Sequence, residues 1–220
     1  MRSVLPWFVL IVGFGFPYAW AEPVRLDVDL ARSYIAVHVG KSGFFSAFAG
    51  HEHGVLATDW SAEVCYENAK REASSARIEV KTASVVIDTP EARLKAGLKP
   101  EGPGADDARK IHAKMQSEEN LAVEAHPLIS FRTTSVRSRS EANLLLTGPL
   151  SIRGRSKDVT APVKLEELSG GELRFTGDFR VELTDYGIEP ESVAGVVNVK
   201  DEIGIRFVIY AKPAGVPCSP

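Results

Sequence analysis

Strict alternation of apolar and polar residues recurs along most of this chain. Successive side chains of a strand point to opposite sides, so an apolar residue at every second position predicts a strand with one buried and one wet face. We expect about eight or more such strands, and a long series of them is typical of an antiparallel barrel or sandwich. The clearest alternating segments are 78–82, 129–133, 159–165, 173–183 and 203–209.

One segment interrupts this pattern. From residue 106 to 120 the sequence reads DDARKIHAKMQSEEN, with Ala108, Ile111 and Met115 at helical spacing and acidic residues at its start. The Gly- and Pro-rich residues 97–104 before it are typical of a loop. We therefore expect one α-helix, inserted between strands and packed against a single β domain.

The first 21 residues are typical of a secretory signal peptide. Arg2 precedes an apolar run at 4–15, and Ala19-Trp20-Ala21 is a small-x-small cleavage site. A retained membrane anchor is the alternative, but the run is short of the ~20 apolar residues that a spanning helix needs. We expect the mature protein to begin at Glu22 and to be exported by a bacterium, either to the periplasm or to the medium.

Charge and cysteine content narrow the possible partners. With 26 Lys and Arg against 29 Asp and Glu, the chain has no basic excess for binding a nucleic-acid backbone. Cys65 falls on the polar side of its segment, and Cys218 lies in residues 213–220, which we interpret as a Pro/Gly-rich tail. In an oxidising compartment these cysteines form either one disulfide or two unpaired thiols. Neither has a Cys-x-x-Cys partner, which argues against redox catalysis.

Two histidines form the most chemically distinctive motif. His51 and His53 would face the same way in a strand and could share a metal ion. A third ligand would have to come from His38, His112 or His126. The alternatives are a polar rim for the head group of a ligand, or two surface histidines without a role. The sequence contains no nucleophile elbow, phosphate-binding loop or dinucleotide fingerprint, so no catalytic residues are predicted.

Aromatic residues gather near this motif. Phe44, Phe45 and Phe48 lie between Gly43 and Gly50. They are candidates for the mouth of an apolar site, with core packing as the alternative. Trp60 lies on the inward side of its alternating segment, where core and ligand lining cannot be distinguished.

Four motifs, in order along the chain, resemble the YceI-like family. GFFSAFAG at 43–50 resembles its Gly-x-Phe-x-x-Phe-x-Gly stretch, and the GHEH that follows resembles a subgroup with Gly-His-x-His. HPLISF at 126–131 resembles its Pro-x-Ile-x-Phe element, and LTGPLSIRGRSKDV at 146–159 its strand–turn–strand core. FRVELTDYGI at 179–188, followed by VKDEIGI at 199–205, resembles its closing strands.

This resemblance implies an all-β fold over residues 22–212: a lipocalin-like antiparallel β-barrel of about eight strands with the one inserted helix. It also implies a non-enzymatic carrier that holds a lipid or polyisoprenoid-type amphiphile, such as an isoprenoid lipid or a quinone, in the barrel lumen. Such a carrier needs no cofactor and would meet a membrane only when it delivers its ligand; a homodimer is left open. The competing hypotheses are a periplasmic metal-binding protein that uses His51 and His53, and an enzyme acting on an amphiphile. We select as ligand-binding candidates Phe45, Phe48, His51, His53, Trp60, Ile78, Val80, Phe131, Leu150, Phe179 and Phe207.

Overall fold

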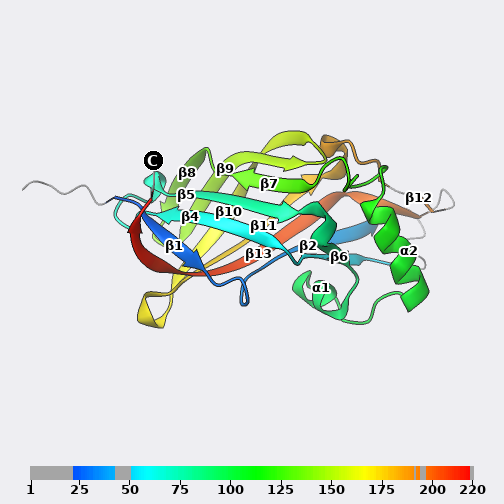
Figure 1. The fold of residues 1–220 in the computed structure, drawn as a ribbon, viewed down its shortest axis with the longest axis horizontal. Coiled ribbons are helices and arrows are strands. Elements are labelled where there is room, and N and C mark those ends of the chain that lie inside the picture. Colours follow the sequence, from blue (N-terminus) through cyan, green and yellow to red (C-terminus); the bar gives the residue numbers. More distant parts are fainter. Residues whose placement is uncertain (1–21, 43–50, 191, 194–196, 219–220) are drawn as a thin grey trace, which may run out of the picture.

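The structure is a computed structural model that describes residues 22–42, 51–190, 192–193 and 197–218. Within these residues eight antiparallel strands close into a barrel, because the last strand pairs with the first (Figure 1). This confirms the predicted fold class. The barrel strands, in spatial order, are β1 (Val24–Val28), β4 (Trp60–Tyr66), β5 (Ser75–Lys81), β7 (Leu128–Arg132), β9 (Asn143–Ile152), β10 (Arg155–Glu167), β11 (Leu173–Glu182) and β13 (Val197–Pro217).

The long strand β13 has two successive neighbours on one side. Its later residues pair with β1, and its earlier residues pair with β2 (Tyr34–Ser42). Next to β2 follow β3 (His53–Ala57) and β6 (Val85–Ile87), so the wall continues beyond the closed ring. Two short additions, β8 (Ser135–Ser140) on β9 and β12 (Ser192–Val193) on β13, complete the sheet of the described residues.

Two α-helices of the described residues lie outside the sheet. The predicted helix is present as α2 (Ala105–Gln116), at the end of the barrel opposite the C-terminus (Figure 1). A second, α1 (Pro90–Lys95), was not predicted. It begins at a recognisable signal: the Thr89 side chain accepts a hydrogen bond from the Ala92 N–H, and Pro90 occupies the first turn. The described chain also contains 3₁₀ turns at Arg71–Ala73, Thr82–Ser84, Ser169–Gly171 and Leu183–Tyr186.

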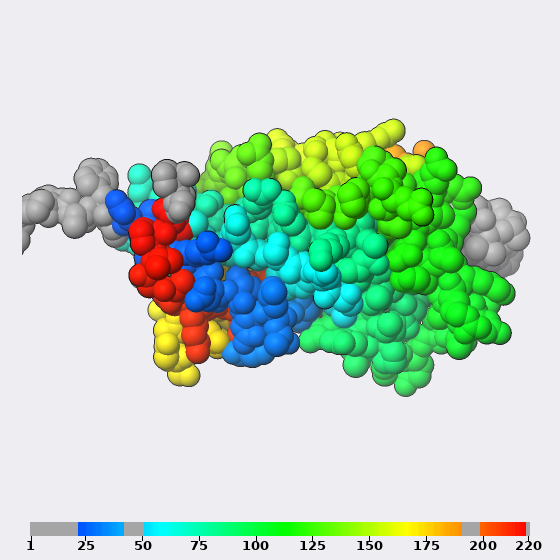
Figure 2. All heavy atoms as spheres, in the orientation of Figure 1, coloured from blue at the N-terminus to red at the C-terminus, as the bar shows by residue number. Residues whose placement is uncertain are grey.

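The C-terminal segment differs from the predicted tail. Strand β13 continues to Pro217, which pairs with Val24, and Cys218 donates its backbone N–H to the Pro23 carbonyl over 3.0 Å. The glycines and prolines in 213–217 favour an irregular tail. The segment nevertheless forms a strand, because its backbone groups hydrogen-bond with those of β1. β1 and the last described residues of β13 therefore lie at one end of the molecule, and α2 forms the surface of the other (Figure 2).

Some predictions lie outside the described residues: the signal peptide at 1–21 and the aromatic residues Phe44, Phe45 and Phe48. Among the helices that the structure describes, none has the length and apolar character required to span a bilayer.

Candidate ligand cavity

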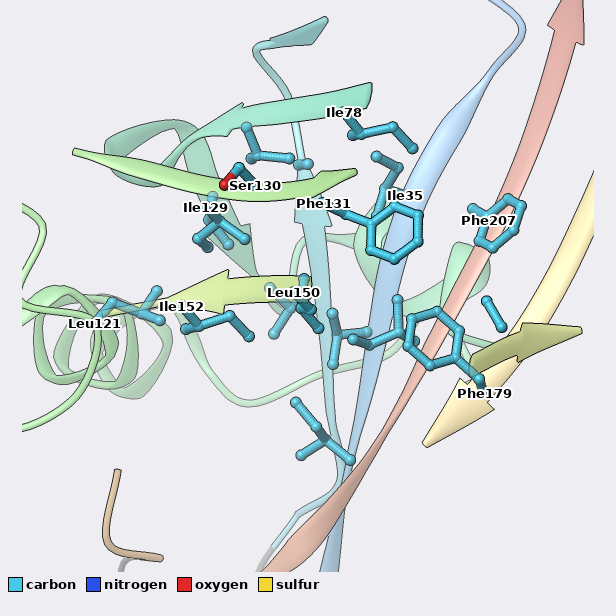
Figure 3. Close-up of a pocket in the computed structure, with 18 of the residues that line it drawn as sticks. Ile35, Ile78, Leu121, Ile129, Ser130, Phe131, Leu150, Ile152, Phe179 and Phe207 are labelled. Carbon is cyan, nitrogen blue, oxygen red and sulfur yellow. The ribbon is translucent and has the colours of Figure 1, made fainter. Parts of the chain in front are cut away.

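The barrel interior holds a cavity of about 600 Å³. Its wall is almost entirely aliphatic and aromatic, because each strand directs alternate side chains inward. Cavities of 300–1,000 Å³ with apolar linings are typical sites for small molecules. Figure 3 shows the central part, where the rings of Phe131, Phe179 and Phe207 lie around the open space with Ile35 and Leu150.

Most of the predicted lumen residues line this cavity. They are His53, Ile78, Val80, Phe131, Leu150, Phe179 and Phe207. The strand register explains why three of them lie in one row: Ile78 on β5 faces Phe131 on β7, which faces Leu150 on β9. Residues that pair across neighbouring strands point to the same side of a sheet.

Two predicted residues lie elsewhere. Trp60 is buried but is not part of the cavity wall; it packs in a core cluster with Val55, Val80, Val85 and Ile209. His51 precedes β3, is exposed and does not line the cavity. No group of three His, Cys, Asp or Glu side chains is placed to hold a metal ion in the part of the chain that the structure describes.

The helix α2 contributes wall residues that were not selected as binding candidates. Ile111 and Met115 line the cavity, together with Leu121 just after the helix. Their helical spacing was visible in the sequence, but only as a face that packs against a barrel. Polar residues also gather on the cavity wall from α2 and its surroundings: Lys110, Lys114, Asn120 and Glu189. One end of the apolar cavity is therefore polar.

A hydrogen-bonded cluster, which we call the His53–Asp88–Arg93 cluster, also belongs to the wall. The fully buried Asp88 carboxylate has Oδ2 2.5 Å from Nδ1 of His53. Its Oδ1 accepts hydrogen bonds from the Gly54 N–H at 3.1 Å and from Nη1 of Arg93 at 2.8 Å. Asp88 and Arg93 could not be selected from the sequence, because they lie on a different segment from His53 and have no motif of their own.

The electrostatics of this cluster favour an ionised Asp88. Burial raises the pKa of the Asp88 carboxyl. The hydrogen bonds from His53, the Gly54 N–H and Arg93 lower this pKa by more than burial raises it, so the pKa lies below its ordinary value. Arg93 also donates to the carbonyls of Glu52 at 2.7 Å and Lys99 at 2.9 Å. The cluster thus fixes the start of β3 against α1.

Gly54 allows this close approach. A Cβ atom at this position would lie 2.5 Å from Cα of Arg93, well inside van der Waals contact. Only glycine therefore fits between β3 and α1 without moving the helix.

The opposite end of the barrel carries the disulfide. Cys65 on β4 is joined to Cys218, which follows β13, with 6.0 Å between their Cα atoms. Cys65 also borders the cavity, beside Tyr66, Ser74 and Ser75. The bond ties the C-terminal strand to the barrel wall.

Comparison with known proteins identifies relatives of this chain. A UPF0312 protein of Azotobacter vinelandii is 26% identical over 185 residues, which are 80% of this chain and 82% of the relative. The crystal structure of BcnA from Burkholderia cenocepacia has a TM-score of 0.63 at 19% identity, covering 84% of this chain and all of the other. A polyisoprenoid binding domain from Saccharophagus degradans has a TM-score of 0.53 at 11% identity, covering 86% and 99%.

The match to a family is more extensive. The YceI-like domain matches residues 26–211, from β1 into the last barrel strand. This range contains all four motifs that carried the resemblance and every described residue of the cavity wall. The chain therefore belongs to the YceI-like family.

Proposed function

We propose that this protein is an exported carrier that holds a lipid or polyisoprenoid-type amphiphile in its barrel lumen. The observation that carries the proposal is the cavity of about 600 Å³ with its almost continuous apolar wall. Transfer of an alkyl chain from water into such a wall is favourable by about 0.8 kcal/mol per buried methylene. A chain of isoprenoid length would supply binding energy without any charged contact.

Two further features support this proposal. The related structure from Saccharophagus degradans is described as a polyisoprenoid binding domain and has the same fold. The cavity also combines a long apolar wall with a polar end near α2, which matches the chemistry of an amphiphile. The signal-peptide character of residues 1–21 supports export, which would place the carrier in the periplasm or outside the cell.

Native mass spectrometry of protein purified without detergent tests the carrier function. We expect a co-purifying apolar mass of a few hundred daltons or more, or saturable uptake of an added long-chain isoprenoid. A matched pair of variants on β4 separates lumen from surface: Ala62 lines the cavity, whereas its neighbour Ser61 is exposed. Ala62→Trp should reduce ligand occupancy, while Ser61→Trp should leave it unchanged.

Thermal unfolding of both variants checks that each is folded. The proposal fails if the parent protein neither carries nor takes up an apolar molecule. It also fails if a folded Ala62→Trp protein retains full occupancy, because the ligand would then lie outside the lumen.

A further inference from the structure

The imidazole of His53 is held as part of a rigid cluster. Asp88 has both carboxylate oxygens occupied, one by His53 and the other by the Gly54 N–H and Arg93. Arg93 is itself anchored to two backbone carbonyls. Because its supporting partners are fixed, the ring is oriented before any ligand arrives.

The cluster determines which ring nitrogen carries the proton. A carboxylate can only accept hydrogen bonds, so Nδ1 of His53 is the donor toward Asp88. In the neutral ring Nε2 is then a lone-pair acceptor. Within the described residues no side chain or backbone group hydrogen-bonds to Nε2. The His53 side chain is 16% exposed and borders the cavity.

An acceptor in an otherwise apolar wall selects for a particular ligand group. A polar atom that loses water without gaining a partner costs free energy, so a ligand that supplies a donor binds better than one that does not. The carbonyl of a quinone and the oxygens of a phosphate dianion present only further acceptors to Nε2. A hydroxyl supplies the donor.

The charges of the His53–Asp88–Arg93 cluster and of the cavity wall also favour an uncharged head group. Asp88 and Arg93 neutralise each other. Of the lysines on the cavity wall, Lys110 has its Nζ 3.5 Å from Asp107, and Lys114 is paired with Glu119. The remaining charged wall residue, Glu189, would repel an anion. No net positive charge from these residues is left to attract a phosphate or carboxylate.

We propose that Nε2 of His53 is the head-group site of the lumen, and that it accepts a hydrogen bond from the hydroxyl of an isoprenoid or other long-chain alcohol. This inference rests on the proposed carrier function and names the head group that the carrier selects. Asp88 and Arg93 act as positioning residues, since they orient the ring without reaching the ligand themselves.

The test compares three ligands with the same C20 isoprenoid chain: the free alcohol, its methyl ether and its phosphate ester. Binding is measured at pH 8. A net hydrogen bond predicts that the parent protein binds the alcohol about 3- to 10-fold more tightly than the ether. His53→Phe should remove this preference while still binding the chain. His51→Phe, a change at the exposed histidine two residues away, should retain it.

A second measurement needs no variant of the cluster, in case His53→Phe fails to fold. Ring ¹⁵N spectra of the parent protein should show Nδ1 protonated and Nε2 unprotonated at pH 8. The Nε2 resonance should then shift on addition of the alcohol but not of the ether.

The outcomes separate the two proposals. Absence of binding by all three compounds would overturn the carrier function itself. Equal binding of alcohol and ether with an unchanged Nε2 resonance would leave the carrier function standing and overturn the head-group site. Tighter binding of the phosphate than of the alcohol, or a ring protonated on both nitrogens at pH 8, would overturn it as well.

Discussion

The side chain of Phe131 offers a direct test of whether the barrel interior is open. Phe131 is only partly buried, and its ring points into the cavity between β7 and the Phe179 and Phe207 rings (Figure 3). Truncation of a fully packed phenylalanine to alanine costs about 3–5 kcal/mol, because transfer energy is lost and a new cavity forms. Here part of the space beside the ring is already empty, so less contact is lost.

We therefore expect Phe131→Ala to lower the free energy of unfolding by about 1–2 kcal/mol, roughly half or less of the usual cost. The matched control is Leu26→Ala on β1. Leu26 is 2% exposed, packs with Tyr66, Leu165 and Leu173, and does not line the cavity. It should show the full cost of about 2–5 kcal/mol for such a change. Leu26→Ala removes three carbons fewer than Phe131→Ala, yet it should lower the free energy of unfolding by more.

Denaturant unfolding of ligand-free parent protein and both variants measures these differences. An added long-chain alcohol at 100 times its Kd should then stabilise the parent by about 2.7 kcal/mol, or roughly 5–10 °C in Tm for a chain of this size. A cost of 3–5 kcal/mol for Phe131→Ala, together with no ligand-induced rise in the parent, would show a filled barrel and refute the reasoning.

Three further predictions concern other parts of the molecule. Cys218→Ser should lower stability, with an upper figure of about 5 kcal/mol from chain entropy, because the bond to Cys65 spans 153 residues of sequence; unchanged unfolding in oxidised and reduced parent protein would contradict this. Asp88 has a lowered pKa in the folded state, so its contribution is present above its unfolded pKa of about 3.9 and is lost as the pH falls through the folded value. Asp88→Asn should accordingly make stability less dependent on pH below about 4, measured by acid titration of unfolding; an identical acid profile in both proteins would count against the cluster. N-terminal sequencing of exported protein should find Glu22 first, and a retained Met1 would disprove the signal peptide.

Local patterns were sufficient to predict several barrel strands and their inward faces. Phe131 and Ile129 lie on one parity of their segment, Ile78 and Val80 on one parity of another, and all four border the cavity. The prediction is possible because successive side chains of a strand point to opposite faces of the sheet, so sequence parity alone gives their direction. The helix α2 was also predictable from a local pattern, because Ile111 and Met115 recur at helical spacing.

The tertiary structure alone decided which residues meet. His53 begins β3, Asp88 directly follows β6 and Arg93 lies in α1, and only the pairing of β3 with β6 brings them together. In the same way, β13 continues through its glycines and prolines because β1 lies beside it. Such contacts depend on strand order, which no local pattern encodes.

The division between core and cavity was also beyond the sequence. Trp60 and Phe131 both lie on inward parities, yet Trp60 packs into a core cluster while the Phe131 ring faces open space. Parity determines the direction of a side chain. Whether its tip meets another side chain depends on the distance across the barrel, which the tilt and register of all eight strands set together.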